Sequence, residues 1–335
     1  MAELTNIITE TFPQKTVVII GDLVADQFLN GTISRVSREA PVFILRHDTT
    51  KTVPGSAANA AVNVASLGGK PVLIGLAGLD ANGALLLDAL RQAGIATDNI
   101  VTNSSLTTTT KVRVLAGQHY AARQQVIRID YESSPDLDAA TKQTLRDNLA
   151  VAGANADAII ISDYNYGSVF PEIFADALAI SQERGLPLVV DSRFRLESYS
   201  GATSATPNSD EVAQILGEDF TTDDCGRLCE QLGLKSLLVT TGNRGVQLFE
   251  NGQSPLQIDA VGGTEPVDVT GAGDTVIAAY TLGLASGMNF AEAAKIANHA
   301  GGIVVMKKGT ASVTASELTT SISENTDPAV ASNAK

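Results

Sequence analysis

The segment best suited to chemistry is a turn of small residues followed by an aspartate, Gly271-Ala272-Gly273-Asp274. Small residues let backbone N–H groups approach an anion at a helix N-terminus, where the helix dipole favours negative charge. Asp274 would lie in the first turn of that helix, where its carboxylate could accept a proton from an attacking hydroxyl. The segment therefore predicts phosphoryl transfer, with a plain glycine-rich helix cap as the alternative. The sequence contains no Walker A motif, which disfavours a P-loop enzyme.

Three further aspartates, Asp22, Asp163 and Asp191, stand at or just after the ends of predicted strands. Open parallel sheets bind ligands beyond the carboxyl ends of their strands. Together these residues predict a polar crevice for hydroxyl groups or a metal, although each could also be a simple cap.

The elements that would position these residues alternate between strand and helix. Strands are expected at 16–21, 71–76, 158–162, 187–191 and 236–240, and helices at 57–67, 82–93, 171–184, 271–286 and 291–301. This spacing predicts an α/β fold, a doubly wound and mostly parallel sheet flanked by helices.

Two strand-like stretches, 32–48 and 107–130, interrupt this rhythm and predict a small β-sheet lid, with edge hairpins as the alternative. The kinase-like core would then comprise 1–31, 49–106 and 131–319. The tail at 320–335 is rich in Ser, Asn and Ala without a hydrophobic period, and is expected to be disordered.

The composition excludes several classes of function. A net charge of −14 without a long basic stretch argues against a nucleic-acid partner. No apolar run is long enough for a membrane span, and the N-terminus does not read as a signal peptide, so we expect a cytoplasmic protein. Cys225 and Cys229 are expected to be free thiols, because the three histidines are scattered.

From about Val17 to Thr314 the chain resembles the ribokinase-like (PfkB) carbohydrate kinases. Beside the Asp274 motif, Pro54–Asn59 resembles the family's diglycine motif, Thr206–Glu211 its Asn-x-x-Glu element and Val239–Gly245 its phosphate-binding strand and turn. The resemblance implies ATP and Mg²⁺ as cofactors, with Asp274 as the base and the amides of Gly271, Ala272 and Gly273 as the anion hole. It further implies that the acceptor sugar binds at Asp22, Gly55, Ser56, Asn59, Arg113 and Asp163. The nucleotide would bind at Asn208, Glu211, Thr240, Gly242, Gly245 and Asn298. Magnesium would bind through water at Glu211, and a monovalent cation such as K⁺ at Asp268 and Thr270.

A narrower similarity links Gly31–Val42, Thr110–Val114, Arg128–Asp130 and Ser162–Tyr164 to the heptose 7-phosphate kinases. It implies transfer of the ATP γ-phosphate to the anomeric hydroxyl of a heptose that already carries a phosphate. The implied partners of that phosphate are Arg35, Lys111, Arg113 and Arg128, with solvated surface charge as the alternative.

The chain also departs from those kinases. Ser56 replaces the second glycine of the diglycine motif, Asn165-Tyr166-Gly167 lacks a usual lysine, and Asp191-Ser192-Arg193 replaces Asp-Pro-Lys. Arg193 and Arg195 could substitute for the lysines, although Arg and Lys are not interchangeable. A related kinase that phosphorylates a different acceptor is therefore the alternative.

Other functions remain open from the sequence. A kinase for another sugar, sugar phosphate or nucleoside fits the same motifs, and a non-catalytic sugar or nucleotide sensor would not need Asp274. A dinucleotide oxidoreductase is disfavoured, because no Gly-x-Gly-x-x-Gly follows the first strand. Apolar residues in the predicted lid favour a homodimer, namely Val42, Phe43, Ile44, Val112 and Val114.

Overall fold

The computed structural model describes residues 2–118, 123–133, 135–263 and 265–324. Its centre is a nine-stranded sheet made of β1 (Thr16–Gly21), β4 (Lys70–Gly78), β5 (Ile100–Asn103), β8 (Ala158–Asp163), β9 (Leu188–Ser192), β10 (Ser204–Ala205), β11 (Ser236–Thr240), β12 (Val246–Glu250) and β13 (Leu256–Ile258). The strand order is β13-β12-β11-β10-β9-β8-β1-β4-β5. Every pairing from β5 to β11 is parallel, whereas β12 runs antiparallel to both of its neighbours.

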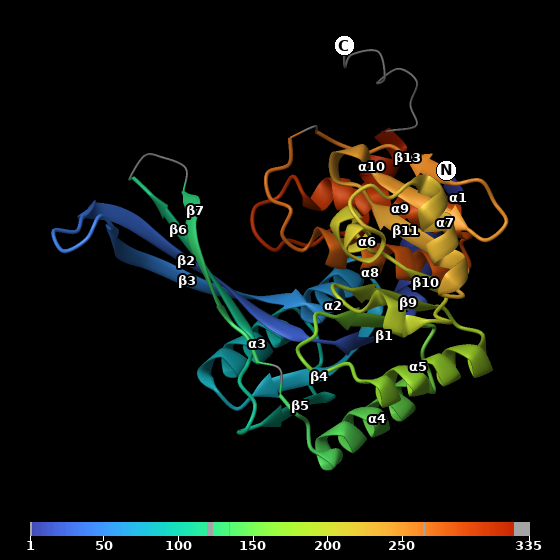
Figure 1. Ribbon diagram of the computed structural model, residues 1–335, viewed down its shortest axis with the longest axis horizontal. Coiled ribbons are helices and arrows are strands. Elements are labelled where there is room, and N and C mark those ends of the chain that lie inside the picture. Colours follow the sequence, from blue (N-terminus) through green and yellow to red (C-terminus); the bar gives the residue numbers. More distant parts are fainter. Residues whose placement is uncertain (1, 119–122, 134, 264, 325–335) are drawn as a thin grey trace, which may run out of the picture.

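Helices cover both faces of this sheet (Figure 1). One core contains residues of α2 (Ala57–Ser66), α3 (Ala81–Gln92), α8 (Ala272–Ala285), α9 (Phe290–Val304) and α10 (Ala315–Glu324). The other contains residues of α4 (Ala139–Gly153), α5 (Pro171–Arg184), α6 (Ser209–Leu216) and α7 (Thr222–Gln231). The short α1 (Ala2–Asn6) precedes the sheet.

The residues of β1 explain why the sheet is covered on both sides. Val17 and Ile19 belong to the first core, and Val18 and Ile20 belong to the second. Successive side chains of a strand point to opposite faces, so an unbroken apolar run requires burial on both. The predicted doubly wound α/β architecture is confirmed.

A second sheet projects from the core (Figure 1) and is called the projecting sheet below. It consists of β2 (Leu23–Val36), β3 (Phe43–Ser56), β6 (Thr110–Gly117) and β7 (Gln124–Tyr131), in the order β3-β2-β6-β7. The β2 and β3 strands pair along their whole length. The predicted boundaries at 31/32 and 48/49 therefore fall inside strands and not between domains.

The predicted disorder at 320–335 is wrong for its first residues, because 320–324 form the end of α10. Leu318 and Ile322 lie four residues apart on this helix and are both buried, while Thr314 and Glu317 cap its start. The rest of the tail, 325–335, lies outside the described residues. Within the described ranges, no helix is long and apolar enough to cross a membrane.

Candidate active site

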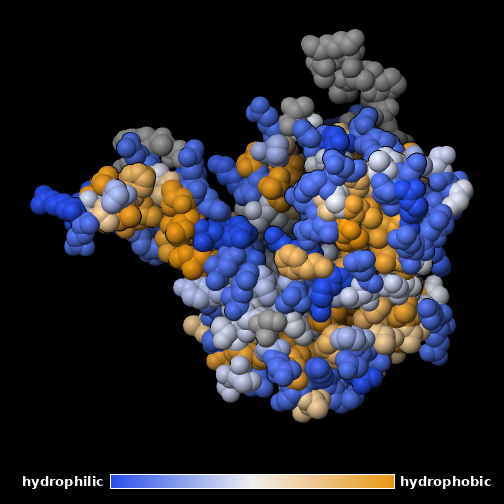
Figure 2. Space-filling view, viewed as in Figure 1, coloured by the Kyte–Doolittle hydropathy of each residue, from blue (hydrophilic) through white to orange (hydrophobic). Residues whose placement is uncertain are grey.

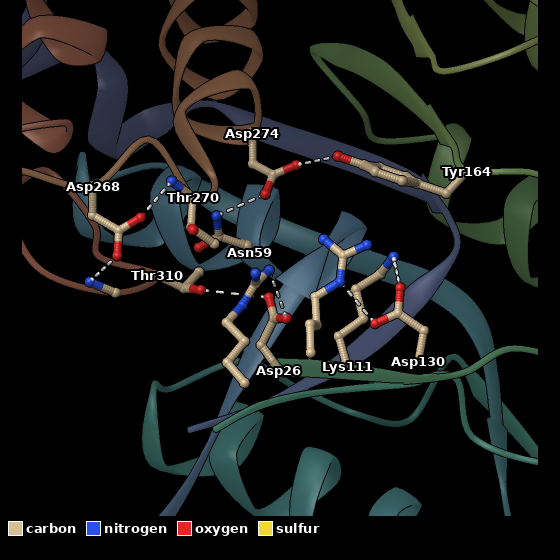
Figure 3. A network of polar contacts seen from close by, with 12 residues as sticks. Asp26, Asn59, Lys111, Asp130, Tyr164, Asp268, Thr270, Asp274 and Thr310 are labelled. Carbon is tan, nitrogen blue, oxygen red and sulfur yellow. Dashed lines mark hydrogen bonds and ion pairs between the residues drawn. The ribbon is translucent and has the colours of Figure 1, made fainter. Parts of the chain in front are cut away.

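Asp274 lies at the start of α8 and is only 4% exposed. Asn59 of α2 donates a hydrogen bond from Nδ2 to Asp274 Oδ2 at 2.8 Å. The Tyr164 hydroxyl donates to Asp274 Oδ1 at 3.3 Å from the loop after β8. The two donors approach the carboxylate from different elements (Figure 3), so the position of Asp274 is fixed from two sides.

The contact between α2 and α8 depends on small and polar residues. Gly271 has φ 77°, and a Cβ there would lie 2.5 Å from Asn59 Nδ2. The Thr275 hydroxyl donates to Asn63 Oδ1 at 3.0 Å, and Asn63 Nδ2 donates to the Asn59 carbonyl at 3.0 Å. A glycine is thus required for Asn59 to reach Asp274.

The surroundings of Asp274 tune its acidity. Burial raises the pKa of Asp274 to about 7, and the negative charge of Asp26 acts in the same direction. The hydrogen bonds from Asn59 and Tyr164 oppose this rise in pKa, because they favour the charged carboxylate. A carboxyl group with a pKa near neutral pH is suited to accept and release a proton.

The amides predicted to bind the anion are not equivalent. The Ala272 N–H already donates to the Val269 carbonyl at 3.2 Å, so this amide is committed to the turn. Within the described residues no such partner is found for the N–H groups of Gly271 and Gly273. A Cβ on Gly273 would meet nothing within 4 Å, so open space adjoins this turn. Among the described residues the amides of Gly271 and Gly273 thus remain available for the predicted anion site, whereas the Ala272 amide already has a partner in the turn.

Sequence reasoning missed Asp26 on β2, which is 5% exposed. Arg113 Nη2 lies 3.3 Å from Asp26 Oδ1, and the Thr310 hydroxyl lies 3.4 Å from Oδ2. A Cβ on Gly55 would lie 2.6 Å from Oδ2, which explains the glycine. Burial raises the pKa of Asp26, opposed by the positive charges of Arg113 and Lys111. An acidic residue beside the apolar run that opens β2 was the signal that could have identified it.

Asp22 and Asp163, predicted to bind the acceptor, have structural roles instead, and both are 1% exposed. Asp22 accepts three backbone N–H bonds of 2.9 Å from Tyr164, Tyr166 and Ser168. Asp163 accepts hydrogen bonds from Arg195 at 2.6 and 3.0 Å, and from the side chains of Ser192 and Tyr199. Because their oxygens already accept these bonds, the two carboxylates brace the loop after β8, and Asp22 also lines a small cavity of about 20 Å³ with Tyr166 and Ser168.

A largely apolar cavity of about 230 Å³ adjoins the Gly273 turn. Its lining includes the predicted nucleotide residues Thr240, Gly242, Gly245 and Asn298 together with Ala272 and Gly273. Asn298 Nδ2 donates to the Asp259 carbonyl at 2.8 Å, which fixes one wall. The size and apolar walls suit a planar heterocycle whose phosphates would extend toward α8.

Asn208 and Glu211 form a reciprocal capping box at the start of α6. Each side chain accepts the other residue's backbone N–H at 2.9 Å. Burial raises the pKa of Glu211 and also that of Asp191, whose acidity is further weakened by the charges of Glu211 and Asp274. A hydrated Mg²⁺ bound near these two carboxylates would offset the repulsion between their negative charges. Among the described residues, no cluster of three or more His, Cys, Asp or Glu could hold a metal directly.

The predicted monovalent-cation residues tie two loops together. Asp268 Oδ1 accepts the Thr270 N–H at 3.0 Å, and Oδ2 accepts the Gly309 N–H at 2.9 Å (Figure 3). These bonds lower the pKa of Asp268. Each carboxylate oxygen keeps a further lone pair, so a cation would bind in addition to these bonds.

The cations predicted to contact a sugar phosphate are dispersed by the fold. Arg113 is paired with Asp26, and Arg35 is exposed on the outer part of β2. Lys111 and Arg128 instead lie on the same face of the projecting sheet and line one cavity with Arg193. The remaining predicted acceptor residue, Ser56, precedes α2 with φ 54° and ψ −131°.

Comparison with known proteins identifies the family. Residues 14–317 match the model of the pfkB family of carbohydrate kinases. The chain is 39% identical over 308 residues to the bifunctional protein HldE of Azorhizobium caulinodans, covering 90% of this chain and 63% of that protein. It is also 39% identical over 319 residues to the bifunctional protein HldE of Caulobacter vibrioides, covering 92% and 63%. The chain thus spans less than two thirds of the length of these relatives.

Solved structures show the same fold. Arabidopsis thaliana ribokinase complexed with ribose and ATP superposes with a TM-score of 0.70 at 22% identity, covering 92% of this chain and 98% of that one. Escherichia coli phosphofructokinase-2 in complex with potassium gives a TM-score of 0.73 at 17% identity, with the same coverage.

Proposed function

The chain belongs to the pfkB family of carbohydrate kinases, and from this premise we propose that it transfers the γ-phosphate of ATP to a hydroxyl group of a sugar phosphate. The observation that supports this proposal is a buried carboxylate, Asp274, beside free amides at a helix N-terminus and next to a cavity that suits a planar heterocycle. Asn59 and Asp26 approach the same position and would hold the acceptor.

The proposed step is an in-line displacement. The acceptor hydroxyl oxygen forms a bond to the γ-phosphorus while the bond between that phosphorus and the β–γ bridging oxygen breaks, which releases ADP. The hydroxyl proton passes to the Asp274 carboxylate, and the amides of Gly271 and Gly273 stabilise the charge of the transferring group. General-base assistance of this kind contributes about 10²–10⁴-fold.

Bound magnesium would neutralise phosphate charge, with Glu211 and Asp191 as its outer protein contacts through water. A monovalent cation at Asp268 and Thr270 is a further proposal. Both assignments concern positioning of the nucleotide, and the proton is moved by Asp274 in either case.

Heptose 7-phosphate is the acceptor that we propose first, with heptose 1,7-bisphosphate as product. The motifs similar to heptose 7-phosphate kinases and the 39% identity to bifunctional HldE proteins support this choice. Another sugar, sugar phosphate or nucleoside is the alternative within the same chemistry.

A homodimer through the projecting sheet is also proposed. The face of this sheet opposite Asp26 and Lys111 carries Ile127 and Ile129, which are 54% and 43% exposed. Figure 2 shows apolar side chains gathered along the projecting sheet. Such an apolar surface is typical of a protein–protein interface.

The test is phosphoryl transfer by the purified chain to heptose 7-phosphate, fructose, ribose and their phosphates, followed by ADP release. Asp274→Asn should lower turnover by about 10²–10⁴-fold and leave acceptor binding by calorimetry almost unchanged. Asp88→Asn, an exposed change on α3, is the matched control and should keep the full rate. Normal turnover by Asp274→Asn would reject Asp274 as the base.

A further inference from the structure

Asn63 on α2 is a polar side chain with 0% exposure. Its Nδ2 donates to the Asn59 carbonyl at 3.0 Å and to Asn59 Oδ1 at 3.3 Å. Its Oδ1 accepts from the Thr275 hydroxyl at 3.0 Å and from the Val313 N–H at 3.4 Å. Burial of an amide is costly without such bonds, and an apolar side chain of similar size would need no partners. The amide therefore indicates a role beyond packing.

The orientation of the Asn63 amide is fixed by two backbone groups that can each act in only one way. The carbonyl of Asn59 can only accept a hydrogen bond, and the N–H of Val313 can only donate one. Asn63 must therefore present Nδ2 toward Asn59 and Oδ1 toward Val313. The reverse orientation would place acceptor against acceptor and donor against donor.

The orientation of Asn63 in turn determines that of Asn59. The oxygen and nitrogen of an amide have nearly the same shape, so packing alone does not decide which of them points where. Because Asn63 Nδ2 can only donate, it holds Asn59 Oδ1 on its own side. Asn59 Nδ2 is then left to donate to Asp274 Oδ2 at 2.8 Å (Figure 3). The Gly271 carbonyl also lies on that side, at a longer 3.4 Å from Nδ2.

This orientation matters most after the proposed proton transfer. A charged Asp274 favours the Asn59 donor by itself. Once Asp274 has taken up a proton, an amide that can turn would present its oxygen and accept a hydrogen bond from the protonated carboxyl group. That bond would stabilise the protonated acid and hinder recovery of the base. In this structure the turn would place Asn59 Nδ2 against Asn63 Nδ2, which are both donors.

We propose that Asn63 is a positioning residue for the base, because by fixing the amide of Asn59 it keeps a donor directed at Asp274 throughout the reaction. The proton is then released again after each transfer. This inference rests on the proposed kinase function. Among the hydrogen bonds of the described residues, Asn63 makes none to Asp274, so its effect is transmitted by Asn59.

Other groups also influence the titration of Asp274. Tyr164 donates to it from the loop after β8, and the charges of Asp26 on β2 and Asp191 on β9 act on the same position. The variants described below leave all three residues in place. A displaced titration of Asp274 in an Asn63 variant therefore reports on the Asn59 amide.

The experiment measures kcat/KM between pH 5 and 10 with the acceptor that gives the highest rate in the substrate panel. The acidic midpoint, the pH at which kcat/KM falls to half its maximum on the acidic side, should lie near the pKa of Asp274, about 7. Asn63→Leu should move it to higher pH by about one pH unit, the contribution of one hydrogen bond. At pH 7 the rate should then fall by about fivefold, and it should recover at high pH.

Val64→Ala is the matched control, because Val64 is the next residue of α2 and is also 0% exposed. It should lower stability by loss of packing and leave the acidic midpoint in place. In an Asn59→Ala background, Asn63→Leu should cause no further displacement, since the amide that it orients is gone. Asn63→Ala is the second variant in case the leucine protein does not fold. A water molecule in the vacated volume can donate or accept, so it would not fix Asn59, and the same movement is expected.

Three outcomes would overturn the role of Asn63: an unchanged acidic midpoint in its variants, an equal movement in Val64→Ala, or a movement that persists in the Asn59→Ala background. NMR of the Asp274 carboxyl carbon, identified with Asp274→Asn, follows the same titration without turnover. A titration that moves as expected in a protein that phosphorylates no acceptor would count against the kinase function alone. Phosphoryl transfer with an unmoved titration would count against the role of Asn63 alone.

Discussion

At the scale of single residues, the environment of Asp274 determines what the site can do. The carboxylate is removed from solvent, yet each oxygen accepts one hydrogen bond, from Asn59 or Tyr164. An exposed aspartate would be a weak base at neutral pH, because its conjugate acid is strong. Burial reverses this, and the pKa of about 7 places the group where proton acceptance and release are both possible.

This acidity predicts a pH dependence. A base acts only when deprotonated, so kcat/KM should fall as pH drops through about 7, the pKa of Asp274. Tyr164→Phe removes a hydrogen bond that favours the charged carboxylate, so the pKa of Asp274 should rise. The acidic limb of the pH profile, where kcat/KM falls as pH decreases, should then move to higher pH. At pH 7 the variant should lose about three- to tenfold in rate. A kcat/KM profile between pH 5 and 9 measures both effects.

Tyr166→Phe is the matched control for this profile, because that phenol donates to Glu132 and not to Asp274. It should leave the position of the acidic limb unchanged. A wild-type limb near pH 4, or equal movement of the limb in both tyrosine variants, would contradict the assignment of the limb to Asp274.

At the scale of elements, the junction between β3 and α2 stores backbone strain. Ser56 has φ 54° and ψ −131°, a conformation that glycine adopts readily and other residues rarely do. The side chain makes no capping hydrogen bond to α2 that would offset the strain. The serine that departs from the diglycine pattern therefore occupies a position with glycine geometry.

Ser56→Gly should stabilise the protein by about 1 kcal/mol, since relief of roughly 1–3 kcal/mol of strain exceeds the entropic cost of a glycine. Urea unfolding followed by circular dichroism measures the change. Ser66→Gly, at the end of the same helix with ordinary helical geometry, is the control and should destabilise. A loss of stability in Ser56→Gly would show that the serine has a favourable role in the fold.

At the scale of the whole molecule, the projecting sheet separates two surfaces by strand alternation. Asp26, Lys111 and Arg128 point to the face that carries the candidate site, while Val114 and Ile127 point to the other. One register thus supplies both polar groups for a ligand and apolar groups for a partner. Shifting it by one residue would exchange the two surfaces.

Ile127→Asp should convert the proposed dimer to a monomer, because a charge replaces a 54% exposed isoleucine in the middle of the apolar face. Analytical ultracentrifugation measures the mass of each variant. Val151→Asp introduces the same charge at a 76% exposed valine on α4, outside the projecting sheet, and should remain dimeric. A monomeric wild type, or a dimer that tolerates Ile127→Asp, would contradict the proposed interface.

The sequence by itself indicated the five parallel strands β1, β4, β8, β9 and β11 and the Asp274 turn, whereas β5, β10, β12 and β13 were not predicted. These features follow from local rules, since the apolar runs of β1 and β8 require a sheet covered on both faces, and the small residues before Asp274 favour a helix start. Short-range patterns carry this information because they reflect the periodicity of one element at a time.

Only the tertiary structure decided which acidic and basic groups face the site. Asp22, at the end of a strand, was the natural choice from sequence, yet it accepts three backbone amides and Asp26 lies in the site instead. Likewise Arg195 forms an ion pair with Asp163, whereas among the described residues Arg193, two positions earlier, forms none. The reason is physical, because the hydrogen-bond partners of these groups come from segments 32 to 146 residues away in the sequence, and no local pattern encodes them.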